Sequence, residues 1–412
     1  MSWSRVPLRR IYRRVEIRGR ADLPLLSVYR DYGVVPRAGR EDNYNKPSDD
    51  LSSYKVVEPG DLVLNKMKTW QGSLGVSAHR GIVSPAYLVG RRIAQVEDGF
   101  MHHLLRSQPL IAAYGSRSKG IRPSQWDLPW EEFASIVLNI PNRFEQRAIA
   151  DFLDSETARI DALITKKRRM IDLLEARARS EIDRAVGIVV DWSNAGVPRP
   201  REQGLRIARL GVVCHIQSGL TLDAAREVDP DVQPLPYLRV ANVQDGSIDL
   251  SELKEVRVPG HLAARTMLRE GDVLMTEGGD PDKLGRGAVW PGHIRPCLHQ
   301  NHVFAVRPGA NVCSDYLALL TRSSYARAYF EVTASKTTGI ASTSTTKIAS
   351  FRVPLPPSHT QAQVVARWQT TNAKITTAID TLTSQNALLR EHRQALITAA
   401  VTGDLSIPGA AA

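Results

Sequence analysis

The chain has 412 residues, of which 42% are hydrophobic and 24% are charged, and its 54 Lys and Arg residues against 43 Asp and Glu give a net charge of +11. This composition is typical of a folded domain protein and excludes an intrinsically disordered chain, and no apolar run approaches the roughly 18 residues that a membrane helix needs. A basic surplus of this size favours a polyanionic partner, most simply nucleic acid.

The cysteine content and the N-terminal segment indicate the cellular compartment of the protein. The three cysteines, Cys214, Cys297 and Cys313, show no C-x-x-C spacing. Such a sparse, odd set predicts no disulfide framework and fits a reducing environment. The N-terminal segment is basic but lacks the apolar stretch of a secretory signal. We therefore expect a cytoplasmic protein with no membrane partner.

Residues 1–139 predict the first globular domain. They contain short β-type runs, such as Leu62-Val63-Leu64 and Gly81-Ile82-Val83, separated by turn residues. Most of the basic surplus lies in this segment, whereas the helical segments that follow are nearly balanced in charge. We expect a mixed α/β domain here.

Residues 140–190 predict a single long helix. The segment has no Gly or Pro between Pro141 and Gly187 and is rich in Ala, Leu, Arg and Glu. Lys167 and Glu181 interrupt an otherwise apolar a/d seam. A helix of about 40 residues would be about 60 Å long and would need a partner to cover its apolar stripe. The seam residues are Ile164, Ile171, Ala178 and Ala185 at seven-residue spacing, with Leu153, Ile160 and Leu174 on the interleaved positions.

A linker and a second globular segment follow. Residues 191–200 hold a glycine and two prolines and predict the linker, and residues 201–354 predict a second mixed α/β domain. The second segment echoes the first, because Arg269-Glu270-Gly271-Asp272-Val273 resembles Glu58-Pro59-Gly60-Asp61-Leu62 and Gly339-Ile340 resembles Gly120-Ile121. A Gly-Asp turn is common, so this echo is weak by itself.

Residues 355–403 predict a second long helix, and residues 404–412 a tail. Residues 140–186 align onto 355–401 without a gap at a constant offset of 215. A repeat of this kind indicates a tandem duplication with the plan globule, helix, globule, helix. The identical pairs are Pro141/Pro356, Gln146/Gln361, Ala158/Ala373, Ile160/Ile375, Ile164/Ile379, Leu173/Leu388, Leu174/Leu389, Ile182/Ile397, Ala185/Ala400 and Val186/Val401.

The fold class that follows is α+β. We expect two globular mixed α/β domains separated by two long helices that pack on each other as an antiparallel coiled coil with pseudo-twofold symmetry. On periodicity alone, a generic coiled-coil dimerisation arm stays open as an alternative. The residues expected to pack the helix pair are Ile160, Ile164, Ile171, Leu174, Ile375, Leu382, Leu389 and Leu396.

Three stretches of the sequence resemble a known family. They are residues 140–164, which include Glu145-Gln146-Arg147, the closing run 389–403, and residues 26–34 with 81–87. Across essentially the whole chain these stretches resemble the specificity subunits of type I restriction–modification systems. The second helix departs from the family pattern, because Thr360-Gln361-Ala362 stands where an acidic-Gln-Arg entry is expected. That departure puts a capping or partner contact at this helix start in doubt.

The resemblance implies a non-catalytic DNA-recognition subunit. Each globular segment would be a target-recognition domain that reads one half of a split site in double-stranded DNA. The helix pair would set the distance between the two domains and dock two methyltransferase subunits, and restriction motor-nuclease subunits would complete the enzyme. Because methyl transfer and ATP-driven cleavage occur in those other chains, this chain is expected to be no enzyme and to hold no cofactor and no metal.

Sequence readout needs side chains with directional donors and acceptors, and phosphate contacts need positive charge. Several loop clusters combine the two kinds of residue, although any single member could equally be an ordinary solvated residue. In the first domain the candidates are Lys66, Lys68, Trp70, Gln71, Ser73, Arg117, Lys119, Arg122, Ser124 and Gln125. In the second they are Lys283, Arg286, Gln300, Asn301, Lys336, Thr337, Thr338, Ser342, Thr343 and Lys347.

Other functions stay open at this point. Cys297, His299 and His302 are close enough in sequence to suggest zinc ligands, although no second cluster accompanies them. Asp231 followed by Glu252-x-Lys254 matches a degenerate pattern of metal-dependent nucleases. A stand-alone DNA-binding regulator with a coiled-coil arm would share the charge and the helices, but it would have no methyltransferase partner.

Overall fold

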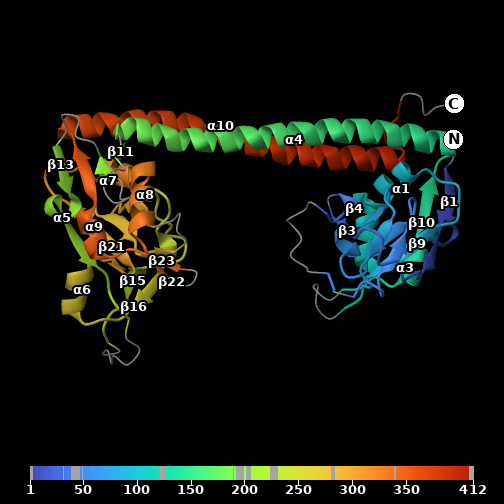
Figure 1. The fold of residues 1–412 in the computed structure, drawn as a ribbon, viewed down its shortest axis with the longest axis horizontal. Helices are drawn as coiled ribbons and strands as arrows, with labels where there is room; N and C mark the ends of the chain where they lie inside the picture. Colours follow the sequence, from blue (N-terminus) through green and yellow to red (C-terminus); the bar gives the residue numbers. More distant parts are fainter. Residues whose placement is uncertain are drawn as a thin grey trace. The chain divides into compact units, whose positions relative to one another are not determined.

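The computed structural model describes residues 3–30, 32–38, 47–48, 50–120, 126–188, 190–191, 199–200, 206–222, 231–279, 284–337 and 340–407. The chain divides into two compact units, residues 1–168 with 383–412 and residues 169–382. Each unit holds one globule and about half of each long helix, α4 (Arg143–Val186) and α10 (Ser358–Thr402) (Figure 1). The division therefore runs through the helices, because each half-helix packs against a globule. Neither these two helices nor any other helix of the described ranges has an apolar stretch long enough to cross a bilayer.

A four-stranded antiparallel sheet forms the centre of the first unit. Its order is β2 (Tyr12–Val15), β9 (Tyr87–Arg92), β6 (Leu62–Asn65) and β7 (Leu74–Val76). Successive side chains of a strand point to opposite faces, so the all-apolar run of β6 can be buried on both sides. Leu62 and Leu64 pack with the helices on one face, and Val63 packs with the small strand pairs on the other.

The remaining elements of the first unit cover these two faces. The covering helices are α1 (Asp98–Leu105) and α2 (Gln108–Arg117). The strand pairs are β3 (Leu26–Tyr29) with β4 (Gly33–Pro36), β5 (Lys55–Val57) with β8 (Gly81–Val83), and β1 (Ser4–Pro7) with β10 (Val137–Ile140). The short helix α3 (Trp130–Ala134) precedes β10, which leads directly into α4.

The second unit repeats this plan. Its central antiparallel sheet has the order β14 (Cys214–Ser218), β21 (Val303–Pro308), β17 (Val273–Thr276) and β19 (Gly287–Val289). Helices α7 (Ser314–Thr321) and α8 (Ser324–Thr333) follow the sheet in the chain, as α1 and α2 do in the first unit. The pair β13 (Arg206–Arg209) with β24 (Arg352–Leu355) leads into α10, as β1 with β10 leads into α4.

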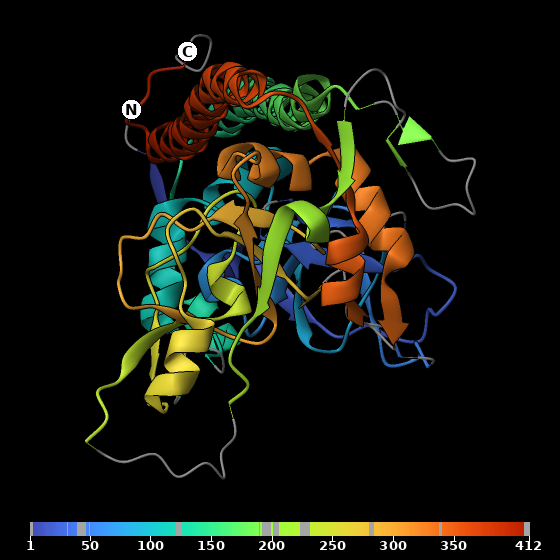
Figure 2. The ribbon, with the colours of Figure 1, turned by 90° about the vertical axis from the view of Figure 1, so that its left-hand side faces the viewer.

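Smaller elements complete the second unit. One sheet joins β16 (Lys254–Val256), β15 (Leu235–Leu238) and β20 (Leu298–His299), and another joins β18 (Gly278–Gly279), β23 (Ile340–Ser342) and β22 (Ser335–Thr337). The short helices are α5 (Leu210–Val213), α6 (Gly260–Thr266) and α9 (Thr345–Ser350), and β11 (Val190–Asp191) pairs with β12 (Arg199–Pro200). Figure 2 shows α5, α6 and α9 on the globule and the helix segments of α4 and α10 together along one side of it.

The similar Gly-Asp sequences of the two segments form the same turn before the central strand of each sheet. Asp61 and Asp272 stand just before β6 and β17, are 1% and 0% exposed, and each accepts the amide N–H of the residue three positions earlier. Asp61 pairs with Arg91 on β9 at 2.7 Å, and Asp272 pairs with Arg307 on β21 at 2.7 Å. The glycine before each aspartate has a φ of +87° or +85°, a conformation that favours glycine. The echo of Gly120-Ile121 cannot be compared in this way, since Gly339 lies outside the described residues.

A glutamine in the first turn of each long helix joins the helix to its globule. Gln146 accepts the amide of Glu97, the residue before α1, at 2.9 Å. Gln361 accepts the amide of Cys313, the residue before α7, at 2.8 Å. The departure at residues 360–362 therefore leaves this contact in place. The start of α4 has a reciprocal cap that α10 lacks. The Glu145 amide donates to the Asn142 side chain at 3.0 Å, and the Asn142 amide donates to the Glu145 carboxylate at 3.2 Å. Pro357 and Thr360 stand at these positions in α10.

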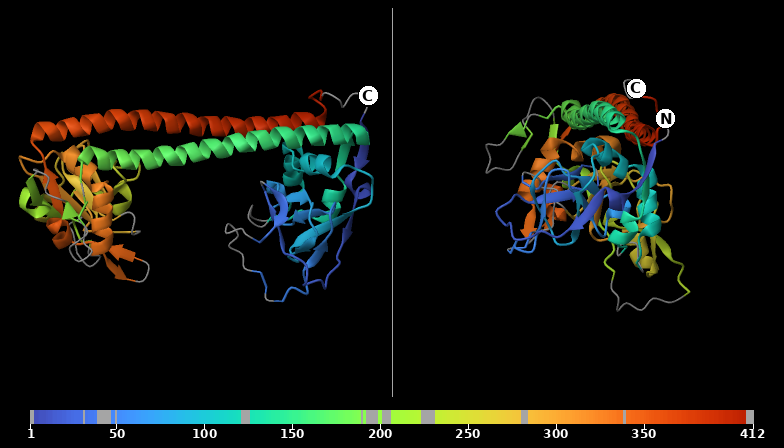
Figure 3. Two further views of the ribbon diagram at one scale, coloured as in Figure 1. Left: turned by 45° about the horizontal axis from the view of Figure 1, so that its top comes forward. Right: turned by 90° about the vertical axis from the view of Figure 1, so that its right-hand side faces the viewer.

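The two helices pack on each other in an antiparallel arrangement within each unit (Figures 1 and 3). In the first unit Asp161 pairs with Arg393 at 3.1 Å, and Lys167, further along α4, donates to Gln385, which is further back along α10. The expected seam residues are buried or half-buried. Ile160 and Ile164 of the first unit and Ile375 of the second are 5–6% exposed, and Ile171, Leu174, Leu382, Leu389 and Leu396 are half-buried.

Candidate nucleic-acid interface

In the first unit the two predicted clusters meet at one end of the central sheet. The turn from β6 to β7 spans residues 65–73, and it lies against the segment that follows α2. Lys66 forms an ion pair with Asp127 at 2.6 Å, and the rings of Trp70 and Trp126 lie 5.1 Å apart. The backbones of Lys119 and Asp127 exchange two hydrogen bonds of 2.9 Å, which closes the second segment into a loop. Segments some fifty residues apart in the sequence thus form one surface.

The individual candidates of this surface differ in exposure. Lys68 and Gln71 are exposed, and Trp70 is half-buried and donates its indole N–H to the Met67 carbonyl. Ser73 is only 6% exposed in this turn, and a DNA contact of its hydroxyl stays a prediction.

The remaining candidates of the first unit lie after α2. Arg117 is half-buried and donates to the Ala113 carbonyl at 3.1 Å. Lys119 is exposed and forms an ion pair with Glu132 at 3.1 Å. Arg122, Ser124 and Gln125 lie outside the described residues. Lys68, Gln71 and Trp70 therefore carry the strongest case for base or phosphate contact in this unit.

The second unit builds a corresponding surface after β17. The amide of Glu277 donates to the His302 carbonyl at 2.9 Å, and the amide of Thr343 donates to the Glu277 carbonyl at 2.7 Å. Gly278 pairs with Ser342 in the sheet of β18 and β23. The turn after β17, the turn between β20 and β21, and β23 are thus joined by backbone hydrogen bonds.

The candidates of this second surface again differ. Gln300, Asn301, Arg286 and Ser342 are half-buried, and Gln300 accepts the Val240 amide at 3.4 Å. Thr343 is only 3% exposed, its amide donates to the Glu277 carbonyl, and a DNA contact of its hydroxyl stays a prediction.

Five further candidates belong to the second unit. Lys347 lies on α9 and donates to the Ser335 hydroxyl at 2.8 Å. Lys336 and Thr337 lie on β22, although the structure does not describe their side chains. Lys283 and Thr338 lie outside the described residues.

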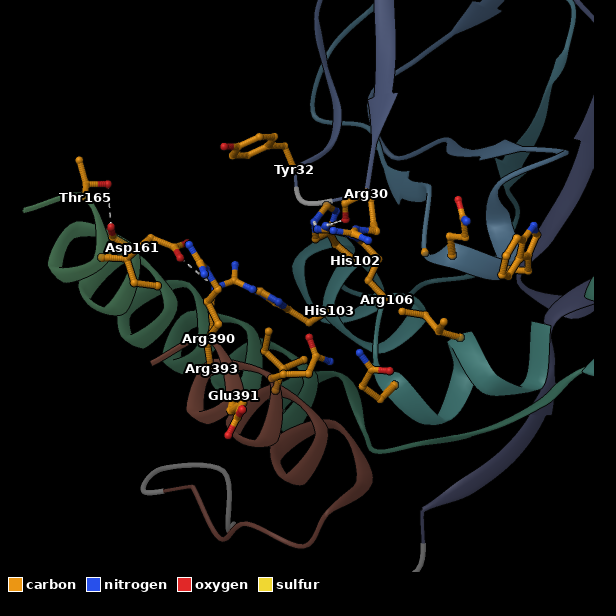
Figure 4. Close-up of a pocket in the computed structure, with 18 of the residues that line it drawn as sticks. Arg30, Tyr32, His102, His103, Arg106, Asp161, Thr165, Arg390, Glu391 and Arg393 are labelled. Carbon is orange, nitrogen blue, oxygen red and sulfur yellow. Dashed lines mark hydrogen bonds and ion pairs between the residues drawn. The ribbon is translucent and has the colours of Figure 1, made fainter. Parts of the chain in front are cut away.

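Sequence reasoning missed two features beside these surfaces. One is the ion pair of Glu277 with His302 at 2.5 Å, which joins two turns that are 25 residues apart. The other is a pocket of about 1150 Å³ in the first unit, lined by Trp70, Gln71 and several arginines (Figure 4). These arginines follow β3 and α1 or lie on α4 and α10. The only sequence signal for this pocket is on α10, where Arg390 and Arg393 lie three residues apart and therefore on one face of the helix.

A histidine of α1 orients one of the pocket arginines. Arg106 donates to the Nε2 atom of His102 at 2.6 Å and to the Arg30 carbonyl at 2.5 Å. Burial lowers the pKa of His102 to about 3, and the nearby positive charge of Arg106 acts in the same direction. His102 is therefore a neutral acceptor at neutral pH, and Arg106 keeps its full charge.

The metal-binding alternatives can be compared with the geometry. Burial raises the pKa of the Cys297 thiol to about 12 and lowers that of His299 to about 4. Both ring nitrogens of His299 are engaged, Nδ1 with the Val303 carbonyl at 2.7 Å and Nε2 with the Gln217 amide at 3.1 Å. Within the described ranges, no three His, Cys, Asp or Glu side chains gather as metal ligands, the zinc and nuclease patterns included.

The chain is similar in sequence to several known proteins. No protein-family model matches the chain. It is 23% identical over 389 residues to the type I restriction enzyme EcoKI specificity subunit of Escherichia coli (strain K12), covering 87% of this chain and 78% of that one. It is 28% identical over 180 residues to the type I restriction enzyme StySPI specificity subunit of Salmonella potsdam, covering 42% and 37%.

Solved structures share the fold over nearly the whole length. One is a chain from a structure on complex assembly and conformational transition of a type I R-M system, with a TM-score of 0.74, 17% identity and 98% of both chains covered. Another is the HsdS subunit from Thermoanaerobacter tengcongensis, with a TM-score of 0.53, 18% identity and coverage of 98% and 97%. The chain is thus similar in sequence to specificity subunits of type I restriction enzymes, and it shares the fold of solved chains from type I restriction–modification systems over nearly its whole length.

Proposed function

We propose that this chain binds double-stranded DNA and that each globule reads one half of a two-part target. The helix pair docks two methyltransferase subunits, and restriction subunits join that assembly. Methyl transfer and cleavage then belong to the partner chains, and this chain supplies recognition without a cofactor of its own.

The observation that carries the proposal is the duplicated surface at the end of each central sheet. Both surfaces combine the turn that follows the buried central strand with the segment that follows the second helix of the globule. Loops that a rigid sheet positions are the usual place for binding residues. Their backbone plan is shared, so the two surfaces can approach DNA in the same manner.

The side chains of the two surfaces differ although their backbones correspond. The central strand of the first unit is followed by Lys66 and Met67, and that of the second unit by Glu277 and Gly278. Lysine donates to guanine acceptors, whereas glutamate accepts from the amino group of cytosine. The two halves of the target are therefore expected to be different sequences.

Co-expression with a type I methyltransferase subunit tests this function. We expect a stable assembly of two methyltransferase subunits with one copy of this chain, and adenine methylation at a two-part sequence. Lys68→Ala with Gln71→Ala is expected to slow methylation of that sequence by about 10-fold or more, as the loss of base or phosphate contacts predicts.

Arg80→Ala is the matched control, because Arg80 lies in the turn between β7 and β8, at the far end of β7 from residues 65–73. A chain that binds a DNA site without forming a complex with the methyltransferase would favour the stand-alone regulator. An assembled complex that binds target and random DNA equally would refute sequence reading by this chain.

A further inference from the structure

The pocket of the first unit is strongly basic. Five arginines line it against two carboxylates, namely Arg30, Arg106, Arg168, Arg390 and Arg393 against Asp161 and Glu391. Figure 4 shows the guanidinium groups of α10 and of the α1 end directed toward the same space between the globule and the helices. A concave surface with walls of one charge sign raises the local concentration of ligands of the opposite sign.

Two of these arginines have defined partners inside the pocket. Asp161 is paired with Arg393 at 3.1 Å, so the carboxylate neutralises one arginine across the two helices. Arg106 is held by the uncharged ring of His102 at 2.6 Å and by a backbone carbonyl. The arginine is thereby oriented without a change in its charge.

The duplicated half of the molecule lacks this cluster. At the offset of 215 residues, Arg168 corresponds to Thr383, Arg390 to Glu175, and Arg393 to Ala178. The helix pair therefore packs at these corresponding positions without the arginines. Arg393 joins α10 to α4 through Asp161, whereas no ion pair between the helices is found for Arg168 or Arg390 among the described residues. The presence of these two arginines in one half alone indicates a role other than holding the helices together.

The end of the first globular helix shows the same asymmetry. Arg322 follows α7 as Arg106 follows α1. In the second unit Arg322 is paired with the carboxylate of Asp245 at 3.0 Å and lies 4.9 Å from the Trp368 ring centre. The second unit thus uses its arginine in an ion pair and a ring contact, whereas the first directs its arginine, beside a neutral histidine, into the pocket.

We infer that this pocket receives phosphate groups of the DNA backbone beside the half-site that the first globule contacts. The inference rests on the proposed function. It follows from the continuity of the surface, because Trp70 and Gln71 belong both to the expected reading turn and to the pocket wall. Arginine forks bind phosphate oxygens with two parallel N–H bonds, and such contacts fix position without reading sequence.

The salt dependence of DNA binding tests the inference in the assembled methyltransferase complex. Arg168→Gln with Arg390→Gln is expected to weaken binding on the order of 10-fold at 0.15 M salt, and to lower the slope of log K against log salt concentration by about 1 to 2. The methylated sequence stays unchanged, because phosphate contacts carry no sequence information. Arg147→Gln with Arg159→Gln is the control, since both arginines are exposed on α4 outside the pocket and no change in slope is expected.

DNA with single neutral methylphosphonate linkages locates the contact. The wild-type complex is expected to lose affinity when linkages beside the first half-site are neutral. The complex with Arg168→Gln and Arg390→Gln is expected to bind the neutral and the charged DNA equally, because its phosphate contacts are already absent. Equal losses at the mirrored linkages beside the second half-site would refute a one-sided site, and so would an unchanged slope in the double variant. Failure of the double variant to assemble in the absence of DNA would assign the pocket to a protein partner. A wild-type complex with no preference for its target would instead refute the proposed function.

Discussion

At the scale of single residues, a buried ion pair stabilises each central sheet. Asp272 is 0% exposed and accepts three hydrogen bonds, one from the Arg269 amide and two from Arg307. Removing one partner of a buried pair leaves the other charge uncompensated. Asp272→Ala is therefore expected to lower the free energy of unfolding of the second unit by about 3 kcal/mol.

Urea unfolding of the full chain measures this loss, and Asp315→Ala, a substitution of an exposed aspartate in the same unit, serves as the control. If Asp272→Ala unfolds at the wild-type urea concentration, the ion pair contributes nothing to the fold.

The pKa of His102 predicts acid sensitivity of the first unit. The folded value is about 3, whereas an exposed histidine titrates near 6.5. Between these values the unfolded chain binds a proton that the folded chain does not, so stability rises with pH across this range and is lost as the pH falls below about 6.5. His102→Gln keeps an acceptor for Arg106 but cannot take up the proton.

Between pH 7.5 and 5.0 the free energy of unfolding decreases in both proteins. The decrease is expected to be about 1–2 kcal/mol smaller for His102→Gln than for the wild type. His359→Gln, at an exposed position of α10, is expected to keep the wild-type pH dependence. An identical pH dependence in the His102 variant would mean that this ring is already charged in the folded chain.

At the scale of elements, the apolar seam of α4 and α10 is the feature on which assembly depends. Leu389 and Leu396 are half-buried in the first unit, on the face of α10 that meets α4. Aspartate at both positions would place two charges in an apolar contact, which is costly when no partner compensates them. Leu389→Asp with Leu396→Asp is expected to abolish the complex with the methyltransferase subunits in size-exclusion chromatography.

The chain offers a close control for this experiment in Leu388, whose side chain is 62% exposed. Leu388→Asp adds one negative charge on the outer face of the helix, next to Leu389, and complex formation is expected to persist. Loss of the complex with both substitutions would point to a partner contact on the outer face instead of the seam.

At the scale of the whole molecule, the duplication predicts independent recognition by the two globules. Each globule has its own sheet, its own core and its own glutamine contact to a long helix. Replacing residues 1–139 by the equivalent domain of a related subunit is expected to change one half of the methylated sequence and to leave the other half intact. Sequencing of methylated adenines measures the outcome, and a change in both halves would show that the globules are coupled.

The order of globule and helix and the pairing of the two helices could be predicted from the sequence, because a seven-residue apolar repeat and a constant offset are local, periodic signals. The sequence also marked both Gly-Asp turns, since a glycine at positive φ followed by a buried aspartate leaves a short pattern. Exposure was harder to predict. Ser73 and Thr343 have the composition of contact residues, yet the backbone hydrogen bonds of their turns bury both hydroxyls.

Which distant residues share a site depends on how the elements pack. Arg30 follows β3, Arg106 follows α1 and Arg390 lies on α10, and no spacing in the sequence relates them. The pairing of Glu277 with His302 likewise depends on two turns that meet only when β17 and β21 form a sheet. Periodic patterns specify an element and the face that it buries, whereas a pocket forms from the ends of several elements, and their meeting is set by packing across the whole unit.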